Sequence, residues 1–241
     1  MLYNFLISLV DQFSALNVFR YLTFRTGLSV LSSMVIVFVI GGPFIKFIES
    51  HRITGPIRDD GPTEHIIKKV GTPTMGGLLI LIGILFGTLL WADLSNPYIW
   101  VLLMVVTSFG LLGAIDDYLK IKRNNSRGIS SAMKIFCQIV LSLIALFLLT
   151  KYGNNEHLKN LYFPFFKNLI LHLGLFFIPF AVFIIVGSSN AVNLTDGLDG
   201  LATVPVMLVA LSFTLICYVT GNTVFSEYLK IPYISNVGET A

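Results

Sequence analysis

Residues 98–123 read YIWVLLMVVTSFGLLGAIDDYLKIKR and contain an abrupt change of polarity. The first 18 of these residues carry no charge, which is close to the roughly 20 apolar residues that a helix needs to cross a membrane. Asp116 and Asp117 follow at once, and three basic residues occupy the next six positions. The stretch therefore predicts a transmembrane helix that ends on a pair of acids.

The composition of the whole chain agrees with a membrane protein. Of its 241 residues, 55% are hydrophobic and only 12% are charged, whereas soluble proteins carry about 25% charged residues. The mean hydropathy is +0.81. The net charge of +3 is small and forms no basic stripe with interleaved aromatic residues, so nothing indicates nucleic-acid binding. Cys137 and Cys217 lie inside apolar runs, which argues against a disulfide framework.

Six apolar runs are candidates for membrane spans. They occupy residues 26–45, 73–92, 98–115 and 135–150, a fifth stretch that begins near residue 168, and a sixth that begins near residue 200 and passes residue 218. Backbone groups in lipid must bond within their own segment, and the alternating pattern of a β-barrel is missing from the sequence, so helices are expected. The predicted fold is all-α and polytopic, with residues 1–241 forming a single integral membrane domain.

The N-terminal residues 1–19 read MLYNFLISLVDQFSALNVF and differ from a signal peptide. No basic region precedes the apolar residues, and Asp11 interrupts them. Apolar side chains recur at helical spacing, namely Leu2, Phe5, Leu6, Leu9, Phe13 and Leu16. The pattern predicts an amphipathic helix that lies at the membrane interface.

Lysine and arginine in the loops predict the orientation in the membrane. The loops at residues 50–72 and 116–134 hold nine of these residues, whereas the loops at residues 93–97, 151–167 and 221–231, which alternate with them, hold four. The two loops with more basic residues are therefore expected in the cytoplasm, and the N-terminus is expected outside. Arg20 and Arg25 oppose the expected position of the N-terminus, because basic residues favour the cytoplasmic side.

The acid pair and the cations after it predict a site for metal and phosphate. Asp116 and Asp117 precede Lys120 by four and three residues, so all three share one helix face. Adjacent carboxylates repel unless a cation neutralises them, and Mg²⁺ characteristically binds through one or two carboxylates plus substrate phosphates. The basic residues beside the pair suit a diphosphate. The alternative is a solvated membrane boundary with local ion pairs.

A second acidic cluster lies in the loop before the sixth span, which the alternation also places in the cytoplasm. Residues 188–200 read SSNAVNLTDGLDG and carry Asp196 and Asp199 without a basic residue. Asn190 and Asn193 stand just before these acids and suit hydrogen bonding to a polar ligand. The alternative is a plain turn, because Asp-Gly pairs are turn signals.

Residues 71–77 read GTPTMGG and open the second span. A proline and small residues suit the start of a closely packed helix. Threonine hydroxyls and an exposed backbone beside Lys68 and Lys69 also suit an anionic ligand at a helix N-terminus. Both interpretations stay open.

Together GTPTMGG, GAIDDYLK and NAVNLTDGLDGLA resemble, in order and approximate spacing, the motifs of the bacterial phospho-N-acetylmuramoyl-pentapeptide transferases. These enzymes are a branch of the polyprenyl-phosphate N-acetylhexosamine-1-phosphate transferases. The resemblance implies transfer of phospho-MurNAc-pentapeptide from UDP-MurNAc-pentapeptide to undecaprenyl phosphate, which gives lipid I and UMP in the first membrane step of peptidoglycan synthesis. It also implies Mg²⁺ as cofactor and a site on the cytoplasmic face of the inner membrane.

The resemblance implies roles for individual residues. Asp116 would be the catalytic base or the organiser of the acceptor phosphate, and Asp117 would assist placement of the metal or the phosphate. Lys120 and Lys134 would contact phosphate. The nucleotide pocket and its rim would be formed by Lys69, Thr74, Asn193, Asp196, Gly197, Leu198 and Asp199. Direct attack by the lipid phosphate and an aspartyl intermediate are both compatible with these roles.

The resemblance also implies more chain than residues 1–241. Members of the family have about ten spans against about six here, and a Gly-Asp loop with the main metal-binding aspartate and a His-rich loop follow a seventh span. The chain is therefore expected to be an N-terminal fragment that is inactive by itself. The alternatives are a sister transferase that uses UDP-GlcNAc and a non-catalytic membrane protein such as a transporter. Besides the bilayer and the two substrates, the expected partner is a second copy in a homodimer.

Overall fold

The computed structural model describes residues 2–51, 75–123, 128–153, 157–163, 166–196 and 200–241. The chain divides into two compact units, of which the first comprises Met1–Trp91 and Val105–Cys137 and the second comprises Ala92–Met104 and Gln138–Ala241. The expectation of one domain over the whole chain therefore stays a prediction.

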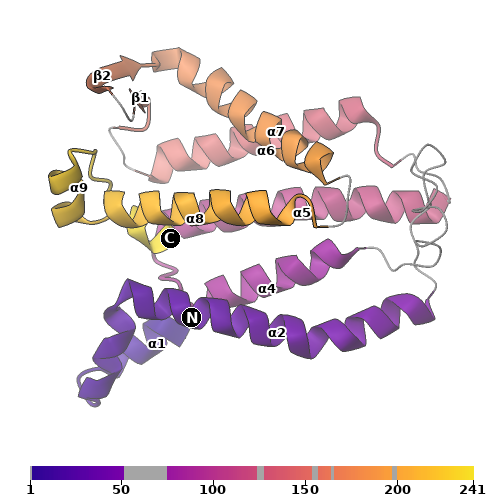
Figure 1. The fold of residues 1–241 in the computed structure, drawn as a ribbon, viewed down its shortest axis with the longest axis horizontal. Helices are drawn as coiled ribbons and strands as arrows, with labels where there is room; N and C mark the ends of the chain where they lie inside the picture. Colours follow the sequence, from indigo (N-terminus) through magenta and orange to yellow (C-terminus); the bar gives the residue numbers. More distant parts are fainter. Residues whose placement is uncertain (1, 52–74, 124–127, 154–156, 164–165, 197–199) are drawn as a thin grey trace. The chain divides into compact units, whose positions relative to one another are not determined.

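The described residues are mainly helical, as the sequence predicts (Figure 1). In chain order the elements are α1 (Leu2–Ser8), the 3-10 helix η1 (Ser14–Arg20), α2 (Leu22–Ser50), α4 (Gly76–Trp91), α5 (Pro97–Arg123), α6 (Ser131–Tyr152), β1 (Asn160–Phe163), β2 (Phe166–His172), η2 (Gly174–Phe176), α7 (Phe177–Thr195), α8 (Thr203–Thr220), α9 (Thr223–Leu229) and η3 (Val237–Thr240).

Within the described ranges, five helical segments are long and apolar enough to cross a membrane. They are α2, α5, α6, the segment Gly174–Thr195 and α8. Of the run expected over residues 73–92, the described part is helical over α4, and Met75 before this helix has a left-handed backbone with φ of 70°. The 16 residues of α4 rise about 24 Å, which is shorter than the roughly 30 Å hydrocarbon layer.

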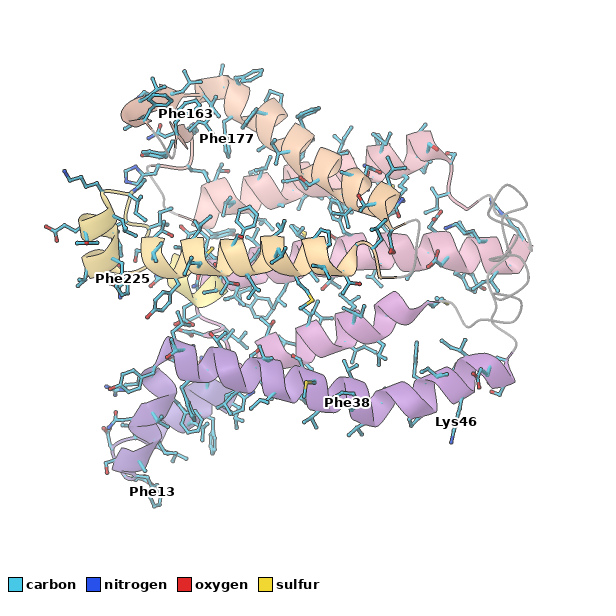
Figure 2. The ribbon with its side chains drawn as sticks, in the orientation of Figure 1. Phe13, Phe38, Lys46, Phe163, Phe177 and Phe225 are labelled. Carbon is cyan, nitrogen blue, oxygen red and sulfur yellow. The ribbon has the colours of Figure 1, made fainter. Side chains whose placement is uncertain are left out.

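The side chains on α2 suit a helix that crosses lipid. Phe38, near the middle of the helix, is 73% exposed, and Lys46 projects near its end (Figure 2). An apolar side chain at mid-helix is stable against hydrocarbon, whereas a long cationic side chain near the end can reach the polar interface. The distribution supports the predicted span.

The N-terminal segment differs from the single amphipathic helix expected over residues 1–19. It forms α1 and η1, and residues 9–13 between them are not helical. The amides of Leu9 and Gln12 bond to carbonyls three residues earlier, as in turns. Asp11 lies in this break, where a short polar side chain is more favourable than inside an apolar helix.

A β-hairpin replaces the start of the fifth predicted span and corrects the all-α expectation locally. Strands β1 and β2 pair antiparallel, with Asn160 opposite His172 and Tyr162 opposite Ile170. The helical segment then begins at Gly174 rather than near residue 168. Apolarity alone led to the prediction of helix, but aromatic residues around a proline favour extended backbone.

Small residues let α2 and α4 pack closely within the first unit (Figure 1). Gly83 and Gly87 on α4 are buried and face Ser29 and Ser33 on α2. The Ser33 hydroxyl donates a hydrogen bond of 2.9 Å to the Gly83 carbonyl. Such pairs of small residues four apart are common where membrane helices approach each other.

We expect Gly87→Leu to destabilise this helix pair. A Cβ atom at position 87 would collide with the Ser33 hydroxyl and lie 2.9 Å from the Ser29 carbonyl oxygen. Overpacking of this kind typically costs about 1–3 kcal/mol, so the midpoint of thermal unfolding in detergent should fall by on the order of 5 °C. Gly77→Leu on the same helix is the control, because no atom lies within 4 Å of its Cβ position. Equal midpoints for the two variants would contradict the packing argument.

A buried arginine ties the N-terminal segment to the same helix pair. Arg25 is 4% exposed, and its guanidinium donates a 3.3 Å hydrogen bond to the Trp91 carbonyl at the end of α4. The guanidinium also lies 4.1 Å from the centre of the Tyr3 ring. Phe19 stacks on Trp91 with ring centres 5.8 Å apart. A cation at the last carbonyl of a helix is favourable because that end carries partial negative charge.

In the second unit, the C-terminal residues pack on the end of α8 (Figure 1). The Ile234 amide donates to the Thr220 carbonyl at 2.9 Å, and the buried Asn96 amide donates to the Asn236 carbonyl at 2.8 Å. Asn96 also accepts from the Tyr98 amide at 2.9 Å, which caps the start of α5. The residues after α8 are therefore an ordered part of this unit.

Candidate functional site

The acid pair lies near the C-terminal end of α5 in the first unit, as the sequence predicts. Lys120 places its ammonium 2.7 Å from Asp116 Oδ2 and 3.1 Å from Asp117 Oδ1. The helical spacing of four and three residues brings the three side chains to one face. One ammonium therefore neutralises part of the charge of two adjacent carboxylates.

The two aspartates differ in their surroundings. The side chain of Asp116 is 13% exposed, whereas that of Asp117 is 40% exposed. Asp116 Oδ1 accepts a 2.7 Å hydrogen bond from the amide of Ile129, in the segment that leads from α5 into α6. Asp116 is consequently held by two donors, and Asp117 presents more of its carboxylate to an incoming group.

Further positive charge lies around the pair. Lys134, in the first turn of α6, is half-buried and acts electrostatically on the Asp116 carboxylate. Arg123, in the last turn of α5, donates a 3.3 Å hydrogen bond to the Gly128 carbonyl. Lysine ammonium groups are suited to bind phosphate oxygens. The carboxylates beside them are suited to bind a hard divalent cation.

The expected convergence of the two acidic clusters stays a prediction, because they belong to different units. Asp196 is the C-cap residue that follows α7 in the second unit, and both it and Asn193 are exposed. Other predicted residues, namely Lys69, Thr74, Gly197, Leu198 and Asp199, lie outside the described residues. Among the residues that the structure describes, no three His, Cys, Asp or Glu side chains gather as a complete metal site would require.

The structure reveals a buried polar network that the sequence analysis missed. Gln138 on α6 is 2% exposed; it donates to the Ser189 hydroxyl at 3.3 Å and accepts from the Asn190 amide at 2.8 Å. The same amide nitrogen donates to the Val186 carbonyl at 2.8 Å. Asn190 therefore bonds within the protein rather than presenting its amide to a ligand.

The network fixes α7 against α6 on the approach to Asn193 and Asp196. Ser142, which is fully buried, donates to the Gln138 carbonyl at 2.7 Å and completes it. Gln138, a polar residue within an apolar run, was the sequence feature that could have predicted this network. Polar side chains inside membrane helices usually form hydrogen bonds to another helix.

Comparison with known proteins agrees with these sequence features. The profile of the family described as Glycosyl transferase family 4 matches residues 99–234, which include all but the first two residues of α5 and the elements from α6 through α9. A second profile, described as Phospho-N-acetylmuramoyl-pentapeptide-transferase signature 1, matches residues 69–81.

Two curated relatives carry the name Phospho-N-acetylmuramoyl-pentapeptide-transferase. The relative from Pelagibacter ubique (strain HTCC1062) is 64% identical over 241 residues, which are 100% of this chain and 67% of the relative. The relative from Rickettsia felis (strain ATCC VR-1525 / URRWXCal2) is 50% identical over 241 residues, which are 99% of this chain and 66% of the relative. The chain thus spans about two thirds of the length of the relatives it matches. With its signature, its acid pair and this identity along its whole length, the chain belongs to the phospho-N-acetylmuramoyl-pentapeptide-transferase family.

Proposed function

We infer that the chain provides the acid pair of a membrane transferase that moves phospho-MurNAc-pentapeptide from UDP-MurNAc-pentapeptide to undecaprenyl phosphate. The products are lipid I and UMP. The observation that carries the proposal is the Asp116, Asp117 and Lys120 cluster near the end of an apolar helix, in a chain that carries the family signature. A lipid phosphate reaches such a position from the bilayer, and a nucleotide reaches it from water.

The chemistry needs positioned charge more than a strong nucleophile. An oxygen of the lipid phosphate forms a bond to the sugar-linked phosphorus, and the bond from that phosphorus to the UMP oxygen breaks. Negative charge moves onto UMP, so cations near the phosphates lower the barrier. We assign this part to Lys120 and Lys134. Asp116 holds Lys120 in place and receives or organises charge at the acceptor phosphate.

We also propose Mg²⁺ as the cofactor. The donor set fits part of such a site, because Mg²⁺ prefers carboxylate oxygens and keeps positions for water and phosphate. Asp117, which is 40% exposed, would hold the ion on the protein side. When bound, the ion would neutralise diphosphate charge. Asp116 is less suited because its two oxygens already accept from Lys120 and Ile129.

The proposal is tested by measuring UMP release and formation of the lipid product. The protein used is residues 1–241 joined to the part of the Pelagibacter ubique relative that the chain does not cover, here named the extended chain. It receives undecaprenyl phosphate with either UDP-MurNAc-pentapeptide or UDP-GlcNAc, with Mg²⁺ and with a chelator. We expect product from the first donor only and only with Mg²⁺. Product from UDP-GlcNAc alone, or no product from either donor, would reject the proposed substrate.

The proposed location is the bacterial inner membrane, with the N-terminus outside and the acid pair facing the cytoplasm. The nine-to-four distribution of lysine and arginine among the loops supports this orientation. We expect Asn125→Cys to react with an impermeant thiol reagent only after cells are opened, and Lys159→Cys to react in intact cells. Both measurements need a background in which Cys137 and Cys217 are replaced. Labelling of position 125 in intact cells would contradict the orientation and the location of the site.

A further inference from the structure

Gly128 lies against the carboxylate of Asp116, where a side chain would not fit. A Cβ atom at position 128 would overlap Asp116 Oδ1, lie 2.8 Å from Asp116 Cγ and lie 3.0 Å from the Asp116 carbonyl oxygen. The described glycines with positive φ are Gly174 and Gly200, so the backbone angles of Gly128 do not require glycine. The requirement at position 128 is therefore one of space.

The absence of a side chain at Gly128 leaves room for the backbone amide of Ile129 beside Asp116. Because nothing projects from Gly128, the Ile129 amide approaches Asp116 Oδ1 to 2.7 Å. The carbonyl of Gly128 accepts from Arg123 at 3.3 Å, which fixes the same backbone segment to the end of α5. A backbone donor on Oδ1 restricts rotation of the carboxylate, and Oδ2 is then presented to Lys120 at 2.7 Å.

We propose that Gly128 is a positioning residue for the transferase reaction, which acts by admitting the Ile129 amide to the Asp116 carboxylate and so fixing Asp116 and Lys120. The inference rests on the proposed function. A side chain at position 128 would push the carboxylate from the Ile129 amide and rotate it away from Lys120. The ammonium proposed to contact phosphate would then lose its fixed position, and misplaced catalytic groups lower the rate of the chemical step.

The first test compares Gly128→Ala with Gly113→Ala in the extended chain. Gly113 lies on α5, is exposed and has no atom within 4 Å of its Cβ position, so it controls for the change from glycine to alanine. We expect Gly128→Ala to lower kcat by roughly 10-fold or more while the KM for the UDP substrate changes less than about 3-fold. Gly113→Ala should match the unmodified protein in both quantities. Unchanged kcat for Gly128→Ala overturns the proposal.

The second test asks whether Gly128 acts through Asp116. In the Asp116→Asn background, we expect Gly128→Ala to cause a further loss of less than about 2-fold, because residues that act as a unit are not additive. A further loss as large as that in the unmodified background overturns the proposal.

The third test does not depend on activity and uses residues 1–241. Hydrogen exchange of the Ile129 amide is measured by NMR on protein labelled with ¹⁵N-isoleucine. We expect slow exchange in the unmodified chain and faster exchange in both Gly128→Ala and Asp116→Ala, with Gly113→Ala unchanged. Equal exchange rates in all four proteins overturn the proposal. If the extended chain had no transferase activity, the proposed function would be rejected. The exchange rates would still show whether Gly128 is needed for the hydrogen bond between the Ile129 amide and Asp116.

Discussion

We expect Asp116→Asn and Asp117→Asn each to lower the turnover of the extended chain by on the order of 10²-fold or more. Asparagine keeps the size of aspartate but removes its charge. At position 116 the oxygen that accepts from Ile129 can be retained, whereas the new amide nitrogen would face the Lys120 ammonium, donor against donor. At position 117 the exposed carboxylate proposed for Mg²⁺ is lost.

Rates of UMP release and thermal unfolding midpoints are measured for both variants. Asp93→Asn is the matched control, because Asp93 is an aspartate outside the site whose oxygen accepts from the Ser95 amide at 3.0 Å, a bond that asparagine can also make. We expect Asp93→Asn to retain turnover within about 2-fold. If both site variants had turnover near that of the unmodified protein, the pair would have no catalytic role, and the alternative of a solvated membrane boundary with local ion pairs would be supported.

We expect Lys120→Met to lower kcat/KM by roughly 10–100-fold with little change in stability. The substitution removes an ammonium that bonds both aspartates and leaves two adjacent negative charges at the proposed phosphate position. Partly exposed ion pairs contribute only about 0–1 kcal/mol to folding, whereas a positioned cation at a reacting phosphate contributes several times more to the transition state. The two measurements therefore separate a functional role from a structural one.

Lys122→Met controls for the loss of one positive charge from the same end of α5. Lys122 is exposed, and on a helix it points away from the face shared by Lys120 and the acids. We expect its kcat/KM to stay within about 3-fold of the unmodified value. Equal losses in the two lysine variants would mean that overall charge near the membrane, rather than the contact with the acids, determines the rate. Lys120→Arg should recover only part of the activity, because a planar guanidinium does not reproduce a compact ammonium.

Much of the fold could be predicted because membrane helices are recognised locally. Runs of apolar residues located α2, α5, α6 and α8. The structure extends the first three beyond the predicted ends, whereas α8 begins at Thr203 rather than near residue 200. The prediction was wrong where apolarity was a poor guide to backbone conformation. The apolar residues of β2 were predicted to start a helix but form a strand, and the N-terminal segment has helical periodicity but a break that includes Asp11.

The candidate site could be predicted only in its helical part. Two acids and a lysine within five positions of α5 must share a face if the segment is helical, and the structure confirms their contacts. Gln138, by contrast, gave only the signal of a polar residue in an apolar run. Its partners Ser189 and Asn190 are more than 50 positions away, so no local pattern identifies them.

The sequence by itself determined that this chain is built mainly of apolar helices, carries the family motifs and has an acid pair at the end of its third apolar run, because apolar length, helical periodicity and motifs are properties of neighbouring residues. Only the tertiary structure decided how that pair is held. The Ile129 amide reaches Asp116 across 13 positions, and it does so because the chain returns at Gly128 without a side chain in the way. Contacts of this kind depend on the path of the backbone after the helix ends. The periodicity of apolar residues in the sequence does not predict that path.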